Sequence, residues 1–228
     1  MERAAVEFGA LSRKYQGEVA ASYEARRTDT KWHAENQAAR ELLAMVPTGL
    51  KTLDAPVGTG RLIPLIAEQQ YDATGLDVSA DMLKQARKCA DEIGARIELV
   101  QGDIRHIPFP DAHFDLVSCL RFLNWIDEEG VRVVLPEIAR VSRAHLLLGV
   151  RYATPLPDLG YTPKDVVSRV STHMGLATFR TRRWGLLVHQ RTTLTDQFER
   201  LRLSIVASRR VERRWDGTDY VFFLLRKS

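Results

Sequence analysis

The sequence is poor in the features that mark several classes of protein. Its 228 residues contain two cysteines, Cys89 and Cys119, which are too few for a disulfide framework and stand in no metal-ligand spacing. No run of about 18 apolar residues occurs, so we expect no membrane span. The first residues, MERAAVEFGALSRKY, lack the basic, apolar and small-residue order of a signal peptide, which predicts a cytoplasmic protein.

The composition of the sequence is typical of a globular protein. Hydrophobic residues make up 45% of the sequence and charged residues 27%, which argues against wholesale disorder. The net charge of +4 is unevenly distributed, because the ten arginines between positions 180 and 214 are accompanied by only three acidic residues. Such a basic stretch is typical of a solvated face or of a surface for nucleic acid or another anion.

The chain divides into four stretches, which we interpret as parts of a single domain. Residues 1–50 have helical patterns, and residues 51–150 repeat a strand, turn and helix order. Residues 151–194 are irregular and form an expected insertion on the substrate side. Residues 195–228 predict a short terminal helix and two strands joined by the turn signal WDG, a β-hairpin.

The alternation of strands and helices predicts an α/β fold. We expect strands at 51–56, 72–78, 96–101, 114–120, 144–150, 203–214 and 218–227. We expect helices at 31–46, after the glycines near 57–60, at 128–142 and at 195–202. A further helix is expected at 80–93, with Ser79 as its N-cap and Gly94 as its stop. Strands that alternate with helices form parallel sheets with helices on both faces, and the final hairpin adds an antiparallel strand.

The most informative segment is LDAPVGTG, in which a strand ending at Asp54 runs into glycines that precede a helix. Small residues let the backbone approach a ligand closely, and a helix N-terminus offers unpaired N–H groups. Asp77 ends the next strand, 19 residues after Gly58, where an acid can accept hydrogen bonds from the hydroxyls of a ribose. Asp103 follows the third strand, so three acids are expected at one edge of the sheet.

Two adenosine cofactors suit such a site, and the sequence favours one of them. A nicotinamide dinucleotide usually needs a third glycine where Ile63 stands, and Asp54 would repel its pyrophosphate. A cofactor without phosphate that carries a positive sulfonium and ammonium suits an acidic crevice better. The residues therefore point to S-adenosylmethionine.

Four segments resemble the successive motifs of class I S-adenosylmethionine-dependent methyltransferases, in the small-molecule, type 11-like branch that includes quinone-biosynthesis enzymes: LDAPVGTGR, GLDVSADML, GDIRHIPFPDAHFDLV and CLRFLNWI. The resemblance covers roughly residues 50–150, and Pro56 departs from it where the family usually has its first glycine. It implies a Rossmann-like, doubly wound and mostly parallel seven-stranded sheet with an antiparallel last strand and an N-terminal helical lid.

The resemblance also implies roles for individual residues. Asp54 would lie near the ammonium of the cofactor, Asp77 would hold its ribose, and Asp103 would accept from the adenine amino group. The other implied cofactor-binding residues are Gly58, Gly60, Val78, Met82, Ile104 and Leu120. Two further candidates do not come from the resemblance: Pro56 in the glycine turn and, in the expected lid, Arg27, which can pair with a carboxylate.

The sequence gives weaker signals for the residues that bind the methyl acceptor, and no catalytic residue is assigned. Candidate substrate residues are Tyr15 and Tyr23 in the lid, and Asn124, Arg151 and Tyr152 just past the fourth and fifth strands. None of the six histidines has a diagnostic spacing; His33 and His189 are the least implausible general bases. The oligomeric state and the identity of the methylated atom are left open.

Three functions fit these patterns. The favoured one is direct methyl displacement onto a small molecule. An RNA methyltransferase is motivated by the arginine-rich stretch, although no separate RNA-binding module is visible. A non-catalytic cofactor-binding regulator or partner protein is motivated by Pro56 and by the lack of an obvious base.

Overall fold

The computed structural model describes residues 30–153, 188–189, 191–213 and 218–228. These residues form one seven-stranded sheet in the order β3-β2-β1-β4-β5-β7-β6. The strands are β1 (Lys51–Asp54), β2 (Asp72–Asp77), β3 (Glu98–Gln101), β4 (Phe114–Cys119), β5 (Ser142–Ala153), β6 (Leu203–Arg213) and β7 (Thr218–Lys227). The first five are parallel, and β7 lies antiparallel between β5 and β6. The predicted mostly parallel sheet with an antiparallel last strand is therefore confirmed.

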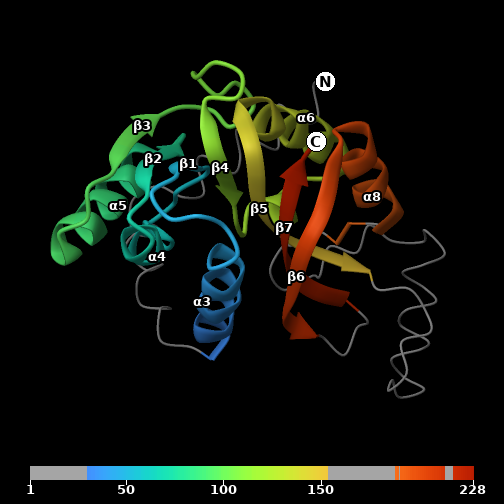
Figure 1. Cartoon of the computed structure of the whole chain (residues 1–228), viewed down its shortest axis with the longest axis horizontal. Helices are drawn as coiled ribbons and strands as arrows, with labels where there is room; N and C mark the ends of the chain where they lie inside the picture. The colour runs from blue at the N-terminus through green and yellow to red at the C-terminus, as the bar shows by residue number, and fades with distance from the viewer. Residues whose placement is uncertain (1–29, 154–187, 190, 214–217) are drawn as a thin grey trace.

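Helices cover both faces of the sheet (Figure 1). They are α3 (Thr30–Leu43), α4 (Ile63–Glu68), α5 (Ala80–Ile93), α6 (Glu128–Val141) and α8 (Arg191–Arg200), with a 3-10 helix η1 (Leu123–Trp125). Apolar side chains of α3, α4 and α5 form one core cluster against the sheet, and those of α6 and α8 form a second cluster against the other face. The α3-side cluster includes Leu147 of β5 and Phe222 of β7, which ties the predicted lid segment to the far half of the sheet.

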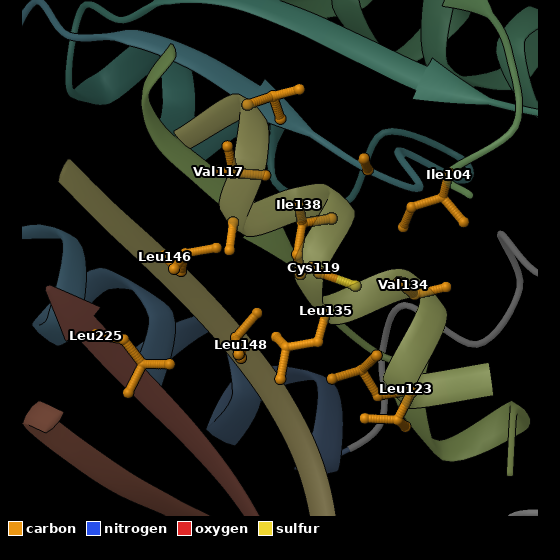
Figure 2. Packing of buried hydrophobic residues seen from close by; sticks show 14 of the residues in the cluster. Ile104, Val117, Cys119, Leu123, Val134, Leu135, Ile138, Leu146, Leu148 and Leu225 are labelled. Atoms are coloured by element: carbon orange, nitrogen blue, oxygen red, sulfur yellow. The ribbon is translucent and has the colours of Figure 1, made fainter. Parts of the chain in front are cut away.

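Side chains of β5 alternate between these two clusters, as the period of a strand requires. Leu146, Leu148 and Val150 face α6, where they pack with the apolar residues shown in Figure 2. Leu147 faces the α3 side. Each such fully buried side chain stabilises the fold by about 1.5–3 kcal/mol. The same alternation places Gly149 and Arg151 on the α3 face.

Helix boundaries follow local capping chemistry. The Ser79 side chain accepts a hydrogen bond from the Met82 N–H at 3.3 Å and starts α5, which ends at Gly94 in the left-handed conformation (φ 68°), as predicted. Asp127 caps α6 in the same way through the Gly130 N–H. As predicted, the glycine segment begins as a turn, in which Gly58 and Gly60 have φ of 56° and 84°, and a helix, α4, follows it.

The differences from the predicted elements concern boundaries. The helix predicted over 31–46 ends at Leu43, and the one predicted over 195–202 is α8, which begins at Arg191. The WDG turn lies outside the described residues, but the antiparallel pairing of β6 with β7 confirms the predicted hairpin. Within the described ranges, no helix is long and apolar enough to cross a membrane.

Candidate functional site

Three acids lie at the carboxyl ends of three neighbouring strands, as the sequence predicted. Asp54 ends β1, Asp77 ends β2, and Asp103 lies two residues beyond β3. Asp54 is in register with Gly75 of β2 and with Ser118 of β4. In an open parallel sheet, ligands bind beyond this edge, so these three positions define the candidate site.

Asp54 is a buried carboxyl group whose environment disfavours its charged form. Burial raises the pKa of Asp54 to about 7, and the nearby charge of Asp77 adds to the effect. The Ser118 hydroxyl donates a hydrogen bond to Oδ1 of Asp54 at 2.7 Å, and the Arg61 guanidinium also opposes the rise. A cation placed against this carboxyl group would favour its ionised form.

Asp77 links the glycine turn to the start of α5. Its Oδ2 accepts a hydrogen bond from the Gly58 N–H, and its Oδ1 accepts one from the Ser79 N–H, each at 2.9 Å. Burial raises the pKa of Asp77 in spite of these bonds. The sequence indicated Asp77 as a ligand-binding acid, but it did not indicate that the carboxylate also fixes both neighbouring backbone segments.

The two glycines of the turn differ in what surrounds them. Among the described residues, a Cβ built on Gly58 would meet no heavy atom within 4 Å, so this part of the structure leaves open space at Gly58. A Cβ on Gly60 would lie 2.6 Å from the Cδ1 atom of Ile63 and 3.1 Å from the Cα atom of Ala86. Gly58 therefore leaves room for a close ligand, whereas Gly60 allows α4 and α5 to pack against the turn.

Asp103 is engaged by a neighbouring cation. Its Oδ2 accepts hydrogen bonds from Nε and Nη2 of Arg105, at 2.9 and 2.5 Å. Burial raises the pKa of Asp103, but the bonds and charge of Arg105 outweigh this and hold it below its usual value. The acid expected to accept from an adenine thus already has a partner within its own loop.

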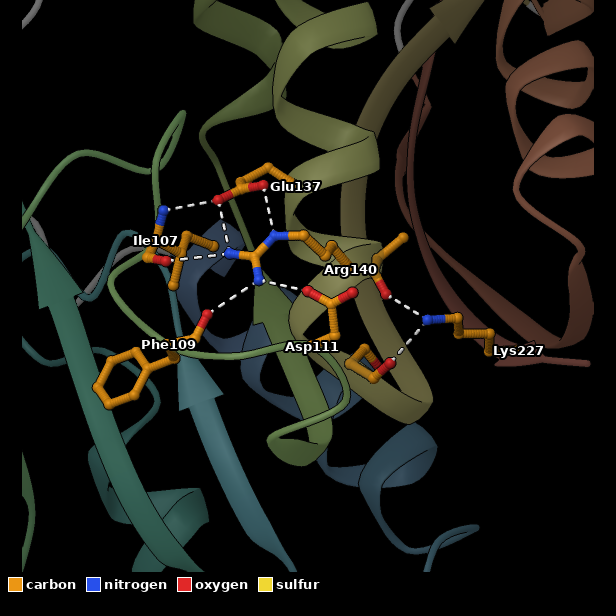
Figure 3. A network of polar contacts seen from close by, with 8 residues as sticks. Ile107, Phe109, Asp111, Glu137, Arg140 and Lys227 are labelled. Atoms are coloured by element: carbon orange, nitrogen blue, oxygen red, sulfur yellow. Dashed lines mark hydrogen bonds and ion pairs between the residues drawn. The ribbon is translucent and has the colours of Figure 1, made fainter.

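The loop that carries Asp103 is anchored to α6 by Arg140 (Figure 3). Arg140 donates to the carbonyl oxygens of Ile107 and Phe109, at 3.0 and 2.9 Å, and to Glu137 and Asp111. Glu137 in turn accepts from the Ile107 N–H at 2.8 Å. This network fixes the position of the loop relative to the sheet, and sequence reasoning did not identify it.

The apolar candidates have different exposures. Val78 is 46% exposed beside Asp77, as expected of a side chain that a flat ligand could cover. Met82, Ile104 and Leu120 are buried, and Ile104 belongs to the α6-side core. Pro56 is half-buried after a cis peptide bond.

Helix α3 is bound to the glycine turn through a buried ion pair. Nη1 of Arg61 lies 2.6 Å from Oε2 of Glu35, a side chain with no exposed surface. Nη2 of Arg61 also donates to the Trp32 carbonyl oxygen and to Oδ1 of Asn36. Sequence reasoning missed Glu35, although its helical spacing from Ala38, Ala39 and Leu42 places it on the buried side of α3.

The residues predicted to bind the methyl acceptor do not all lie on one face of the sheet. Oδ1 of Asn124 accepts from the Arg151 N–H at 2.6 Å, which holds η1 against β5. Arg151 faces α3, whereas Tyr152 packs against the opposite core cluster, so the two side chains lie on different faces of the sheet. Nε2 of His189 lies 2.7 Å from the Leu123 carbonyl oxygen, and burial lowers its pKa.

Three predicted residues, Tyr15, Tyr23 and Arg27, lie outside the described residues. Within the described ranges, no group of three or more histidine, cysteine, aspartate or glutamate side chains could hold a metal ion.

Comparison with known proteins identifies the central part of the chain. Residues 52–145 match a family model described as a methyltransferase domain. A phosphatidylethanolamine N-methyltransferase from Cereibacter sphaeroides is 41% identical over 97 residues, which are 42% of this chain and 46% of that protein. The chain thus spans about half the length of this curated relative.

Solved structures share the fold over nearly the whole chain. The magnesium protoporphyrin IX methyltransferase of Synechocystis PCC 6803 with bound SAH has a TM-score of 0.70 at 16% identity, covering 97% of this chain and 100% of that one. The 1,6-didemethyltoxoflavin-N1-methyltransferase of Burkholderia thailandensis has a TM-score of 0.67 at 19% identity, covering 100% and 89%. Residues 52–145 thus match a methyltransferase domain, and the chain has the fold of the class I S-adenosylmethionine-dependent methyltransferases.

Proposed function

We propose that the protein binds S-adenosylmethionine and transfers its methyl group to a small-molecule acceptor. The observation that carries the proposal is the buried acid pair at the ends of β1 and β2. Burial and the charge of Asp77 raise the pKa of Asp54 to about 7, so the pair suits a ligand that brings positive charge. The open space at Gly58 leaves room for such a ligand beside the pair.

Different residues of the chain bind different parts of the cofactor. Asp54 receives the ammonium, and Asp77 holds the ribose hydroxyls from a carboxylate already fixed by two backbone N–H groups. Val78, exposed between β2 and α5, covers one side of the adenine. Met82 and Ile104 support the same region from buried positions, with Asp103 at the adenine amino group and Pro56 and Gly60 shaping the turn.

S-adenosylmethionine supplies an electrophilic methyl carbon on a sulfonium. The protein's contribution to direct displacement is alignment and exclusion of water, because charge is lost as the methyl group leaves the sulfur. Leu120, buried directly after β4, provides apolar surface near the methionine end of the site. Helix α3, fixed to the glycine turn by the Glu35–Arg61 pair, covers the acceptor side.

Ion pairs formed by the arginines of β6 favour a small-molecule acceptor over RNA. Arg209 forms an ion pair with Glu41 of α3, and Nε of Arg210 lies 3.4 Å from Oδ2 of Asp219. These arginines of β6 are therefore partly neutralised by internal partners, which weakens the case for a phosphate-binding face.

We propose that the lid, core, insertion and hairpin work as one domain, a view supported by the packing of α3 on β5 and β7.

Calorimetry with S-adenosylhomocysteine tests the cofactor site. We expect one site per chain, and we expect Asp77→Ala to weaken binding by about 1–3 kcal/mol because hydrogen bonds to a charged group are lost. Asp72→Ala is the matched control, since Asp72 lies exposed at the other end of the same strand. Equal affinities for the two variants would show that the ribose site is misplaced.

Methyl transfer is then tested with labelled S-adenosylmethionine and a metabolite extract. A labelled small molecule is the expected product. Labelled RNA would support the RNA alternative, and intact cofactor binding without any labelled product would favour a binding protein without catalysis.

A further inference from the structure

The α3 face of the sheet contains a buried arginine that is only partly satisfied. Arg151 of β5 is 1% exposed. Its Nη2 donates to Oε2 of Glu212 at 2.6 Å, but among the described residues Nε and Nη1 have no hydrogen-bond acceptor. A guanidinium carries five N–H donors, and buried donors without partners are costly. The site therefore has unused capacity for an acceptor atom that carries negative charge.

A second unsatisfied donor lies beside it. The Tyr220 ring of β7 lies 5.4 Å from Cζ of Arg151, and the two residues are in register across the strands. The Tyr220 hydroxyl is buried and has no hydrogen-bond partner within the described part of the chain. Burial, followed by the charge of Glu35, raises its pKa well above the usual value, so the hydroxyl remains a donor.

Charged groups surround this pair with a surplus of positive charge. On one side, Lys31 and Arg151 share Glu212, whose Oε2 lies 2.8 Å from Nζ of Lys31. On the other side, Arg61 and Arg121 share Glu35, with Nη1 atoms 2.6 and 3.7 Å from its Oε2. Each group of three has two cations and one anion. The four cations and two anions together carry a net charge of +2, so an anion bound between the two groups would lower the positive charge of the cluster.

The cluster lies next to the methionine end of the proposed cofactor site. A Cβ on Gly149 would lie 2.9 Å from the Tyr220 hydroxyl oxygen and 3.1 Å from Cδ2 of Leu120. Leu120 directly follows β4, two residues after the Ser118 that binds Asp54. The unsatisfied donors thus lie at the same edge of the sheet as the strand-end acids, displaced toward β5 and β7.

We propose that Arg151 and Tyr220 recognise an oxyanion of the acceptor, a carboxylate or a phosphate, so that the protein methylates an anionic small molecule. This inference rests on the proposed methyltransferase function. Glu212 occupies Arg151 when no acceptor is bound, and the incoming oxyanion competes with it. Solvent reaches the cluster at the Lys31–Glu212 pair, whose side chains are 35% and 31% exposed, and at Arg121, which is 36% exposed.

Calorimetry on the full chain with S-adenosylhomocysteine present tests the ligand chemistry. The probes are benzoate, phenyl phosphate and, as the neutral comparison, benzamide. We expect at least one anion to bind ~10-fold or more tightly than benzamide, because a charge-assisted hydrogen bond is lost with the neutral probe. The stronger anion distinguishes carboxylate from phosphate. Equal binding of all three probes, or no binding of either anion, would overturn the proposal.

Variants with opposite expected effects separate recognition from a structural role. Arg151→Gln should weaken binding of the preferred anion ~10-fold or more, and Tyr220→Phe should weaken it several-fold (about 3-fold). Glu212→Gln should strengthen it, since the internal competitor loses its charge. Arg143→Gln is the matched control, because Arg143 lies exposed at the start of the same strand and pairs with Asp115.

The affinity for S-adenosylhomocysteine is measured for every variant, which separates the two proposals. If the unsubstituted protein binds S-adenosylhomocysteine but shows no preference for an anion, only the oxyanion site is refuted. If the unsubstituted protein does not bind S-adenosylhomocysteine at all, the proposed function is refuted. If Arg151→Gln does not fold, Tyr220→Phe and Glu212→Gln still decide the question. Unchanged anion affinity in both would refute it.

Discussion

Replacing Asp54 with asparagine should stabilise the protein at neutral pH and weaken its cofactor site. Burial is the main reason why the pKa of Asp54 rises from 3.8 to about 7. Between these values the unfolded chain releases its proton while the folded protein retains it, so the folded state binds more protons and its stability falls as the pH rises. Asparagine keeps an oxygen that can accept from the Ser118 hydroxyl but carries no charge to bury.

The magnitude follows from the two pKa values. The difference between 3.8 and about 7, at 1.36 kcal/mol for each pH unit, corresponds to at most about 4 kcal/mol of lost stability above pH 7. Between pH 5 and pH 8 the advantage of Asp54→Asn should therefore grow by about 2–3 kcal/mol, since the cost accumulates only up to the folded-state pKa.

Urea unfolding at several pH values between 5 and 8 measures this difference. Asp72→Asn is the control for the loss of one carboxyl group, because Asp72 is exposed. Ser118→Ala provides a second check: removal of its hydrogen bond to the charged form should raise the pKa of Asp54 further. A parallel pH dependence for the unsubstituted protein and Asp54→Asn would refute the assignment of a raised pKa.

The same substitution should have the opposite effect on ligand binding. The affinity of the unsubstituted protein for S-adenosylhomocysteine should rise as the pH increases toward 7, because its ammonium pairs with the ionised form of Asp54. Asp54→Asn should bind more weakly and without this pH dependence. A gain of stability together with a loss of affinity is the expected signature of a carboxylate retained for binding.

Three further predictions concern the scaffold of the site. Gly60→Ala should destabilise the protein by about 1–3 kcal/mol more than Gly58→Ala in urea unfolding, because both have positive φ but only Gly60 places a Cβ 2.6 Å from Ile63. Arg140→Met should cost about 2–4 kcal/mol and increase hydrogen exchange in the loop it anchors; unchanged exchange would contradict the anchoring role. Glu35→Ala should cost about 3–5 kcal/mol in thermal unfolding, since it leaves Arg61 without its buried partner, and a near-neutral effect would show that α3 is not held by this pair.

The sheet was predictable because its signals are local. The strand at Lys51–Asp54, the Ser79 cap and the Gly94 stop each follow from a few neighbouring residues, and the structure confirms them. The position of β7 between β5 and β6 did not follow from the hairpin signal, because that signal pairs the last two strands without showing which of them lies beside the fifth.

The site was predictable only in its outline. Strand ends could be located from the sequence, so the acids at positions 54, 77 and 103 were found. Their partners could not be found, because the bonds from Gly58 to Asp77 and from Arg140 to the loop at 107–109 join segments that are distant in the chain. The same reason explains why Glu35, Arg61, Arg121 and Tyr220 were not recognised as one cluster.

The chain leaves β5 at Ala153 and returns beside it at Val188 and His189. The His189 N–H donates to the Arg151 carbonyl oxygen at 3.0 Å, and His189 forms a parallel bridge with Tyr152. The two ends of the intervening segment are therefore clamped at adjacent points of one strand, and the cost of closing such a loop depends only weakly on its length. A change in the number of residues between these two anchor points should therefore leave the sheet in place at little cost in stability.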